Sequence, residues 1–225
     1  MKIVVLHGQN HKGSTWNITK LLLDELREPA DSVLEFQAND MKPCIGCFSC
    51  ILKDEALCPH RSIVGPIMEA IEQADLFIAE SPNYCMGMSG QMKTFFDHMA
   101  YRWMSHRPHP ALQSKIGVAI STTAGIGAGT ATKDIARQMF WWGIAKTYRL
   151  PFAVAAMNWG EVKDTKKAKI MSRVRKTAKR IKKKAGKAKP GFKSRFIFAM
   201  MRAQQKGSMS WNSIDRKHWE ENGWI

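Results

Sequence analysis

Residues 1–26 read MKIVVLHGQNHKGSTWNITKLLLDEL, an apolar run followed by a polar turn with two glycines and then by a periodic segment. The apolar run, Lys2–His7, is typical of a strand that is buried on both faces of a sheet. Ser14 and Thr15 are favourable N-cap residues, and Ile18, Leu21, Leu22 and Leu26 recur at helical spacing. This opening therefore predicts a strand, a tight turn and a helix, which is the repeating unit of α/β proteins.

The same alternation continues along the chain. Further apolar runs predict strands at 32–37, 76–80, 116–121 and 152–157. Apolar residues at helical spacing predict helices at 63–71, 89–101, 130–142 and 164–187. Strands that alternate with helices form a parallel sheet that helices cover on both faces. We therefore expect a doubly wound, five-stranded α/β domain at residues 1–187, and an extension at 188–225 that packs on the domain or on a partner subunit.

Three glycine-rich or polar stretches, 8–15, 81–90 and 121–130, each follow a predicted strand. The carboxyl ends of parallel strands meet at one edge of the sheet, where such folds bind ligands. The first stretch, GQNHKGST, begins a helix whose N-terminus favours an anion, and its hydroxyls suit the single phosphate of a mononucleotide such as FMN. It matches neither the Walker A loop nor G-x-G-x-x-G. The other two stretches could enclose a flat isoalloxazine ring.

Four of the five cysteines, Cys44, Cys47, Cys50 and Cys58, lie within fifteen residues at the spacing C-x2-C-x2-C-x7-C. Three thiols can converge from one tight loop and the fourth can return to them, as a small iron-sulfur cluster requires. Zinc is the other metal that such a loop could hold, and free thiols are the third alternative. Cysteines in this pattern do not resemble the disulfide framework of a small secreted domain.

The net charge of +16 comes from one segment. Residues 161–206 hold 18 Lys and Arg against 2 acidic residues, and the rest of the chain holds 17 of each sign. The segment is either a solvated helix face or a surface that binds an anionic partner. Phe192, Phe196–Phe198 and Met201 beside a lysine-rich helix also satisfy the description of an interfacial membrane element.

The sequences CIGCFSC at 44–50 and SPNYCMGMSGQMKTFFDH at 81–98, together with the three loops, resemble the NADPH-dependent FMN reductases of the flavodoxin-like fold and, among them, the iron-sulfur flavoproteins. The resemblance covers residues 1–157. It implies an FMN phosphate held by His11, Lys12, Ser14 and Thr15. It also implies a flavin ring that lies against two loops, at Pro82, Asn83, Tyr84, Cys85, Met86, Thr122, Thr123, Ala124 and Gly125. The iron-sulfur relatives imply a [4Fe-4S] cluster on Cys44, Cys47, Cys50 and Cys58. One departure is His98, where relatives carry arginine after Asp97.

We therefore expect an FMN-dependent NAD(P)H oxidoreductase that passes electrons to a quinone, a flavin, a metal ion or a one-electron carrier. The alternative is an iron-sulfur flavoprotein that acts as an electron-transfer module and docks through its basic C-terminal segment. The resemblance implies a homodimer or a higher homo-oligomer. A membrane surface remains a candidate partner, and nucleic acid is disfavoured because the basic helix lacks interleaved aromatic residues. Met1 leads directly into a strand without a leader segment, so we expect a cytoplasmic protein.

Overall fold

The computed structural model describes residues 1–208, 210 and 212–225. Its centre is a parallel sheet of five strands: β1 (Lys2–His7), β2 (Ser32–Gln37), β3 (Leu76–Glu80), β6 (Ile116–Thr123) and β7 (Lys146–Ala153). They lie in the order β2-β1-β3-β6-β7, and every neighbouring pair is parallel. This is the strand order of the flavodoxin-like fold. The prediction of a doubly wound α/β sheet is confirmed.

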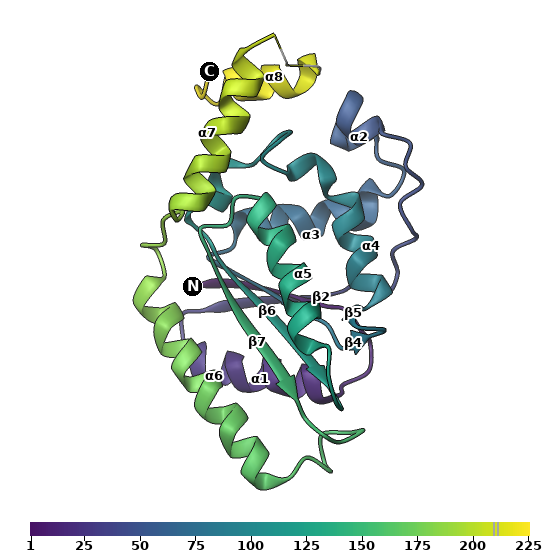
Figure 1. Ribbon diagram of the computed structural model, residues 1–225, viewed down its shortest axis with the longest axis vertical. Helices are drawn as coiled ribbons and strands as arrows, with labels where there is room; N and C mark the ends of the chain where they lie inside the picture. The colour runs from purple at the N-terminus through teal and green to yellow at the C-terminus, as the bar shows by residue number, and fades with distance from the viewer. Residues whose placement is uncertain (209, 211) are drawn as a thin grey trace.

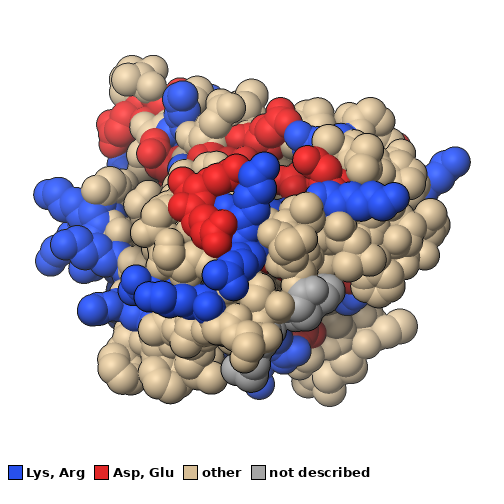
Figure 2. All heavy atoms as spheres, turned by 90° about the horizontal axis from the view of Figure 1, so that it is seen from above, with Lys and Arg blue, Asp and Glu red and all other residues tan. Residues whose placement is uncertain are grey.

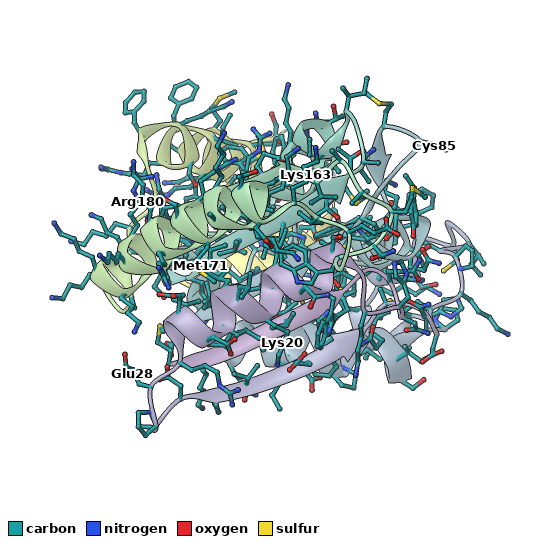
Figure 3. The ribbon with its side chains drawn as sticks, turned by 90° about the horizontal axis from the view of Figure 1, so that it is seen from below. Lys20, Glu28, Cys85, Lys163, Met171 and Arg180 are labelled. Atoms are coloured by element: carbon teal, nitrogen blue, oxygen red, sulfur yellow. The ribbon has the colours of Figure 1, made fainter. Side chains whose placement is uncertain are left out.

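Helices cover both faces of the sheet (Figure 1). Alternate residues of the central strands point to opposite faces, so Val4, Phe77 and Ala119 lie in one core and Val5, Ile78 and Val118 in the other. The first core packs under α3 (Arg61–Gln73), α4 (Gly90–His98) and α5 (Ala128–Trp141). The second core packs under α1 (Ser14–Leu26) and α6 (Asp164–Lys184), which lie side by side in Figure 3.

The prediction for the fifth strand was wrong. The sequence placed it at 152–157, but β7 runs over Lys146–Ala153. Lys146 and Arg149 are exposed, and Pro151 interrupts the apolar run, so the segment does not read as a buried strand. Because β7 is an edge strand, it tolerates both the charged side chains and a proline without an N–H donor.

The remaining elements lie at the ends of the sheet. A short α2 (Ser49–Leu52), which contains Cys50, and the 3₁₀ turn η1 (Glu55–Leu57) lie between the second and fourth cysteines of the loop. A hairpin of β4 (Asn83–Tyr84) and β5 (Gly87–Met88) follows β3. Two further 3₁₀ turns are η2 (Ala100–Arg102) and η3 (Pro110–Ser114). Beyond α6, the chain forms α7 (Phe192–Lys206) and α8 (Ser213–Glu221), and α8 packs beside α2. Within the described residues, no helix is long and apolar enough to cross a membrane.

Candidate functional site

A cavity of about 390 Å³ lies at the carboxyl edge of the sheet, within the volume range of ligand sites. The loops after β1, β3, β6 and β7 all contribute to it. Its lining consists of His11, Ser14, Thr15, Pro82, Asn83, Tyr84, Thr122, Thr123, Ala124, Val154, Ala156 and Met157. The topology thus brings together three predicted loops, as expected for strands that end at one edge.

The turn after β1 is held close to the loop after β3. The Gly8 N–H donates to the Glu80 carbonyl at 2.8 Å, and the Ser89 hydroxyl donates to the Gly8 carbonyl at 2.7 Å. A Cβ at Gly8 would lie 2.8 Å from Ser89 Oγ and 3.0 Å from the Glu80 carbonyl oxygen. Only glycine allows this approach, so Gly8 fixes the path that carries the chain into α1.

Side-chain hydrogen bonds join the loops around the cavity. The hydroxyls of Thr15 and Thr122 lie 2.6 Å apart, and the Gln9 amide donates to the Tyr84 hydroxyl at 2.7 Å. The Asn83 amide donates to the Ile126 carbonyl at 3.2 Å. Gly127 has a φ of 106°, and a Cβ there would lie 2.5 Å from Asn83 Nδ2. These hydrogen bonds join the three loops into one cavity wall.

The hairpin after β3 carries a strained turn. Cys85 and Met86 have φ values of 47° and 65°, in the left-handed region that two-residue hairpins usually fill with Asn-Gly. Both side chains are exposed, and Cys85 projects at the edge of the molecule in Figure 3. Strain of this kind is concentrated at functional sites, and here the turn borders the cavity.

The residues around the cavity fit a cofactor with a phosphate and a flat polar ring. The first turn of α1 offers an anion site, with the Ser14 side chain and His11 beside it. Asn83 Oδ1, on a residue that lines the cavity, is buried without a hydrogen-bond partner, so it has capacity for a ligand. The absence of a Cβ at Gly127 leaves the space that the Asn83 side chain occupies. FMN has this combination of groups.

Nine of the thirteen predicted FMN residues line the cavity. The other four, Lys12, Cys85, Met86 and Gly125, are exposed nearby, and the Lys12 ammonium lies 5.2 Å from the Trp16 ring centroid. Val154, Ala156 and Met157 line the cavity but were not predicted. They follow β7, so the misplaced fifth strand concealed them.

A buried polar cluster lies under the first turn. His7 and Glu80 are paired across β1 and β3, with 2.8 Å between His7 Nδ1 and Glu80 Oε1. His7 Nε2 lies 2.9 Å from Glu35 Oε2. Burial lowers the pKa of His7, but the hydrogen bonds and charges of Glu80 and Glu35 outweigh it, so the pKa is raised overall. Burial raises the pKa of Glu80.

The four cysteines of the 44–58 loop line one small cavity together with Phe48, His60 and His98. Cys44 and Cys47 are exposed, whereas Cys50 and Cys58 are half-buried. In the described part of the chain, no three His, Cys, Asp or Glu side chains are gathered closely enough to hold a metal ion. Burial, followed by the charges of Cys58, Cys44 and Cys47, raises the pKa of the Cys50 thiol to about 11. The Cys50 thiolate is thus disfavoured, first by burial and then by neighbouring thiolates, and a bound cation would offset both effects.

His98 faces this loop. Its Nε2 lies 2.8 Å from the Lys42 carbonyl oxygen, which fixes that nitrogen as the donor. In the neutral form of the ring, Nδ1 then carries the lone pair, and this atom lies 4.0 Å from the Cys58 sulfur. The departure noted in the sequence therefore places an imidazole acceptor against one thiol.

A buried arginine anchors the cysteine loop to the C-terminal extension. Arg107 donates to the Cys50 carbonyl, and to the Ile51 carbonyl at 3.1 Å. Its Nη1 also donates to Asp215 Oδ1 of α8 at 2.6 Å, and both side chains are buried. The Asn212 amide donates to the same Ile51 carbonyl at 2.8 Å. No local sequence pattern signalled these contacts.

Comparisons with known proteins agree with this geometry. Residues 1–159 match the family model described as NADPH-dependent FMN reductase. An iron-sulfur flavoprotein of Archaeoglobus fulgidus is 30% identical over 175 residues, 75% of this chain and 76% of that protein. An iron-sulfur flavoprotein of Methanocaldococcus jannaschii is 29% identical over 135 residues, 59% of this chain and 67% of that protein.

Solved structures with little sequence similarity share the fold. An azoreductase from Bacillus anthracis superposes with a TM-score of 0.60 at 13% identity, covering 80% of this chain and 99% of that chain. An NAD(P)H:quinone oxidoreductase from Methanothermobacter marburgensis gives a TM-score of 0.60 at 14% identity, covering 81% and 97%. The strand order, the loops that meet at the sheet edge and the match over residues 1–159 together show that this chain belongs to the NADPH-dependent FMN reductase family.

Proposed function

We propose that this chain is an FMN-dependent oxidoreductase that takes electrons from NAD(P)H and passes them to a quinone, a flavin, a metal ion or a one-electron carrier. One observation carries the proposal, namely the cavity at the N-terminus of α1, where the predicted FMN loops meet. When bound there, FMN supplies a ring that accepts hydride and releases electrons singly or in pairs.

The residues have separate tasks in this proposal. His11, Lys12, Ser14 and Thr15 hold the phosphate, with the N-terminal dipole of α1 behind them. Pro82, Asn83 and Tyr84 on one loop, and Thr122, Thr123 and Ala124 on the other, position the ring. The Tyr84 side chain is 43% exposed beside the cavity, so its ring is available to the nicotinamide or to the acceptor. No acid-base pair is required for hydride transfer between two flat rings.

The electron-transfer alternative rests on the cysteine loop. Four thiols in one cavity match the donor set of a [4Fe-4S] cluster in kind and number, and burial raises the pKa of Cys50, which disfavours the thiolate of that residue. A metal offsets that cost because a coordinating thiol loses its proton. The cluster would supply one-electron transfer, and the exposed Cys44 and Cys47 would lie nearest to a docked partner.

The visible absorption spectrum of protein purified without oxygen, with iron and acid-labile sulfide analysis, tests both ideas. Flavin bands with about four irons per chain support the iron-sulfur flavoprotein. Flavin bands without iron support the hydride-transfer reductase and contradict the presence of a cluster. A colourless protein that does not take up FMN contradicts the proposal.

An NAD(P)H oxidation assay with an artificial quinone then separates enzyme from electron-transfer module. Turnover by the FMN-loaded protein, and none by flavin-free protein, supports the reductase. Negligible turnover with FMN bound rules out the reductase hypothesis and favours the electron-transfer module.

A further inference from the structure

Helix α7 exposes an apolar stripe. Phe192 is 86% exposed, Phe196 is 55% exposed and Met200 is 47% exposed. The three residues are four positions apart, so they lie on one face of the helix, one above the other. The Phe192 and Phe196 rings are stacked, with centroids 6.4 Å apart. Large apolar side chains that form a contiguous exposed patch mark an interaction surface.

The opposite face of α7 fixes this helix to the protein. The Phe198 ring lies 4.8 Å from the Trp219 ring and 5.1 Å from the Trp224 ring, centroid to centroid. The buried Gln205 amide donates to the Ser105 carbonyl at 3.0 Å. Because the inner face is already packed, the exposed stripe is held outward and cannot turn into the core.

Basic side chains surround the stripe. Lys189, Lys193 and Arg195 are exposed beside Phe192 and Phe196, and the 161–206 segment that contains them holds 18 basic residues against 2 acidic ones. Figure 1 places α6 and α7 along one side of the molecule, and Figure 2 shows Lys and Arg gathered along that same side. The acidic side chains in Figure 2 gather near the middle of the view instead.

We propose that the outer face of α7 binds an anionic lipid surface, with Phe192, Phe196 and Met200 in the headgroup region and the neighbouring lysines and arginines on the lipid phosphates. An apolar face flanked by basic residues is the arrangement that lies in a membrane interface. A second copy of the chain is a poorer partner, because a two-fold contact would bring each basic surface against itself. The inference is independent of the redox chemistry proposed above.

Co-sedimentation of the FMN-loaded protein with vesicles tests this inference. We expect binding to mixed phosphatidylcholine and phosphatidylglycerol vesicles, little binding to phosphatidylcholine alone, and weaker binding at high salt. The double variant Phe192→Ser with Phe196→Ser should lower the partition coefficient by about ten-fold or more, since both rings leave the interface. Both side chains are exposed, so melting temperature and bound FMN should stay unchanged.

The matched control is Leu34→Ser with Ile63→Ser, which removes two exposed apolar side chains far from α7 in the sequence. This control should bind vesicles as the unaltered protein does. Equal binding of the α7 variant and the control would overturn the proposal. A second outcome would also overturn it. In this outcome the unaltered protein binds no vesicles but forms a dimer in analytical ultracentrifugation, and the α7 variant is monomeric.

Discussion

The cavity at the sheet edge and the cysteine loop are held in different ways. The cavity's loops follow strands of one sheet and hydrogen-bond to one another, as Thr15 does to Thr122 and Gln9 to Tyr84. The cysteine loop lacks such a frame, and Arg107 and α8 hold its backbone from outside. The cavity depends on the sheet topology, and the cysteine loop depends on a segment that is distant in the sequence. A substitution that disturbs one region should therefore leave the other unchanged.

Breaking the Arg107–Asp215 pair should have the largest effect. Asp215→Asn removes the buried carboxylate that lies 2.6 Å from Arg107 and leaves this guanidinium only the partly exposed Glu55 at 3.3 Å, which costs about 3 kcal/mol of unfolding free energy. If the two regions are independent, iodoacetamide should alkylate Cys50 and Cys58 faster in this variant than in the unaltered protein. The dissociation constant for FMN, measured on the protein that remains folded, should change by no more than about two-fold, which is a small change in binding free energy. Denaturant unfolding, mass spectrometry of alkylated peptides and an FMN titration measure the three quantities.

The control for this change lies on the same helix. Glu220→Gln breaks the exposed pair between Arg216 and Glu220, which should change stability by less than about 1 kcal/mol. If Asp215→Asn weakened FMN binding as strongly as it exposed the cysteines, the two regions would not be independent.

Gly8→Ala should disturb the cavity at the sheet edge. The new methyl group would overlap the Ser89 hydroxyl and the Glu80 carbonyl, at a cost of about 1–3 kcal/mol in stability. The FMN dissociation constant should rise, and the rate of Cys50 alkylation should not change. Gly90→Ala is the matched variant, because its Cβ would meet nothing within 4 Å. Equal losses in the two variants would show that close packing at Gly8 is not the cause.

Thr122→Val should have a smaller effect on the same edge. The substitution removes the hydrogen bond to Thr15 and should weaken FMN binding by about 1 kcal/mol, with little change in shape. Thr147→Val, on the same pair of strands but at their opposite end, should leave the affinity unchanged. Quenching of flavin fluorescence during titration measures the FMN dissociation constants of both variants. Unchanged affinity in Thr122→Val would show that this residue does not contribute to FMN binding.

The smallest effect concerns pH. The pKa of His7 is raised above its ordinary value of 6.5, so the folded protein binds this proton more tightly than the unfolded chain does. The resulting stability is complete below about pH 6.5 and is lost as the pH rises through the folded-state pKa. The pKa of Glu80 is also raised above its ordinary value of 4.5, so Glu80 likewise contributes stability that is lost as the pH rises.

His7→Gln should therefore flatten the fall in unfolding free energy between about pH 6 and pH 9. Urea midpoints across this range measure the slope. A variant that keeps the slope of the unaltered protein would contradict the assignment to His7.

The two regions also differ in how far the sequence predicts them. Apolar runs and helical periodicity are local signals, and they place β1, β3 and β6 correctly. The nine predicted residues that line the cavity were implied by the family resemblance instead. The signal fails at β7, because an edge strand carries charged residues and Pro151, and the cavity residues that follow it were missed. Arg107 and Asp215 meet only after folding. Nothing in the residues adjacent to either predicts the other.

The anchor of the cysteine loop has a consequence for how the protein is made. Asn212 and Ile51, whose hydrogen bond joins α8 to the loop, are 161 residues apart in the chain. Synthesis proceeds from the N-terminus, and the early part of a domain begins to fold first. The thiols therefore leave the ribosome well before the helix that fastens them. Until α8 is made, the loop lacks the Asn212 hydrogen bond that holds its backbone in the folded protein.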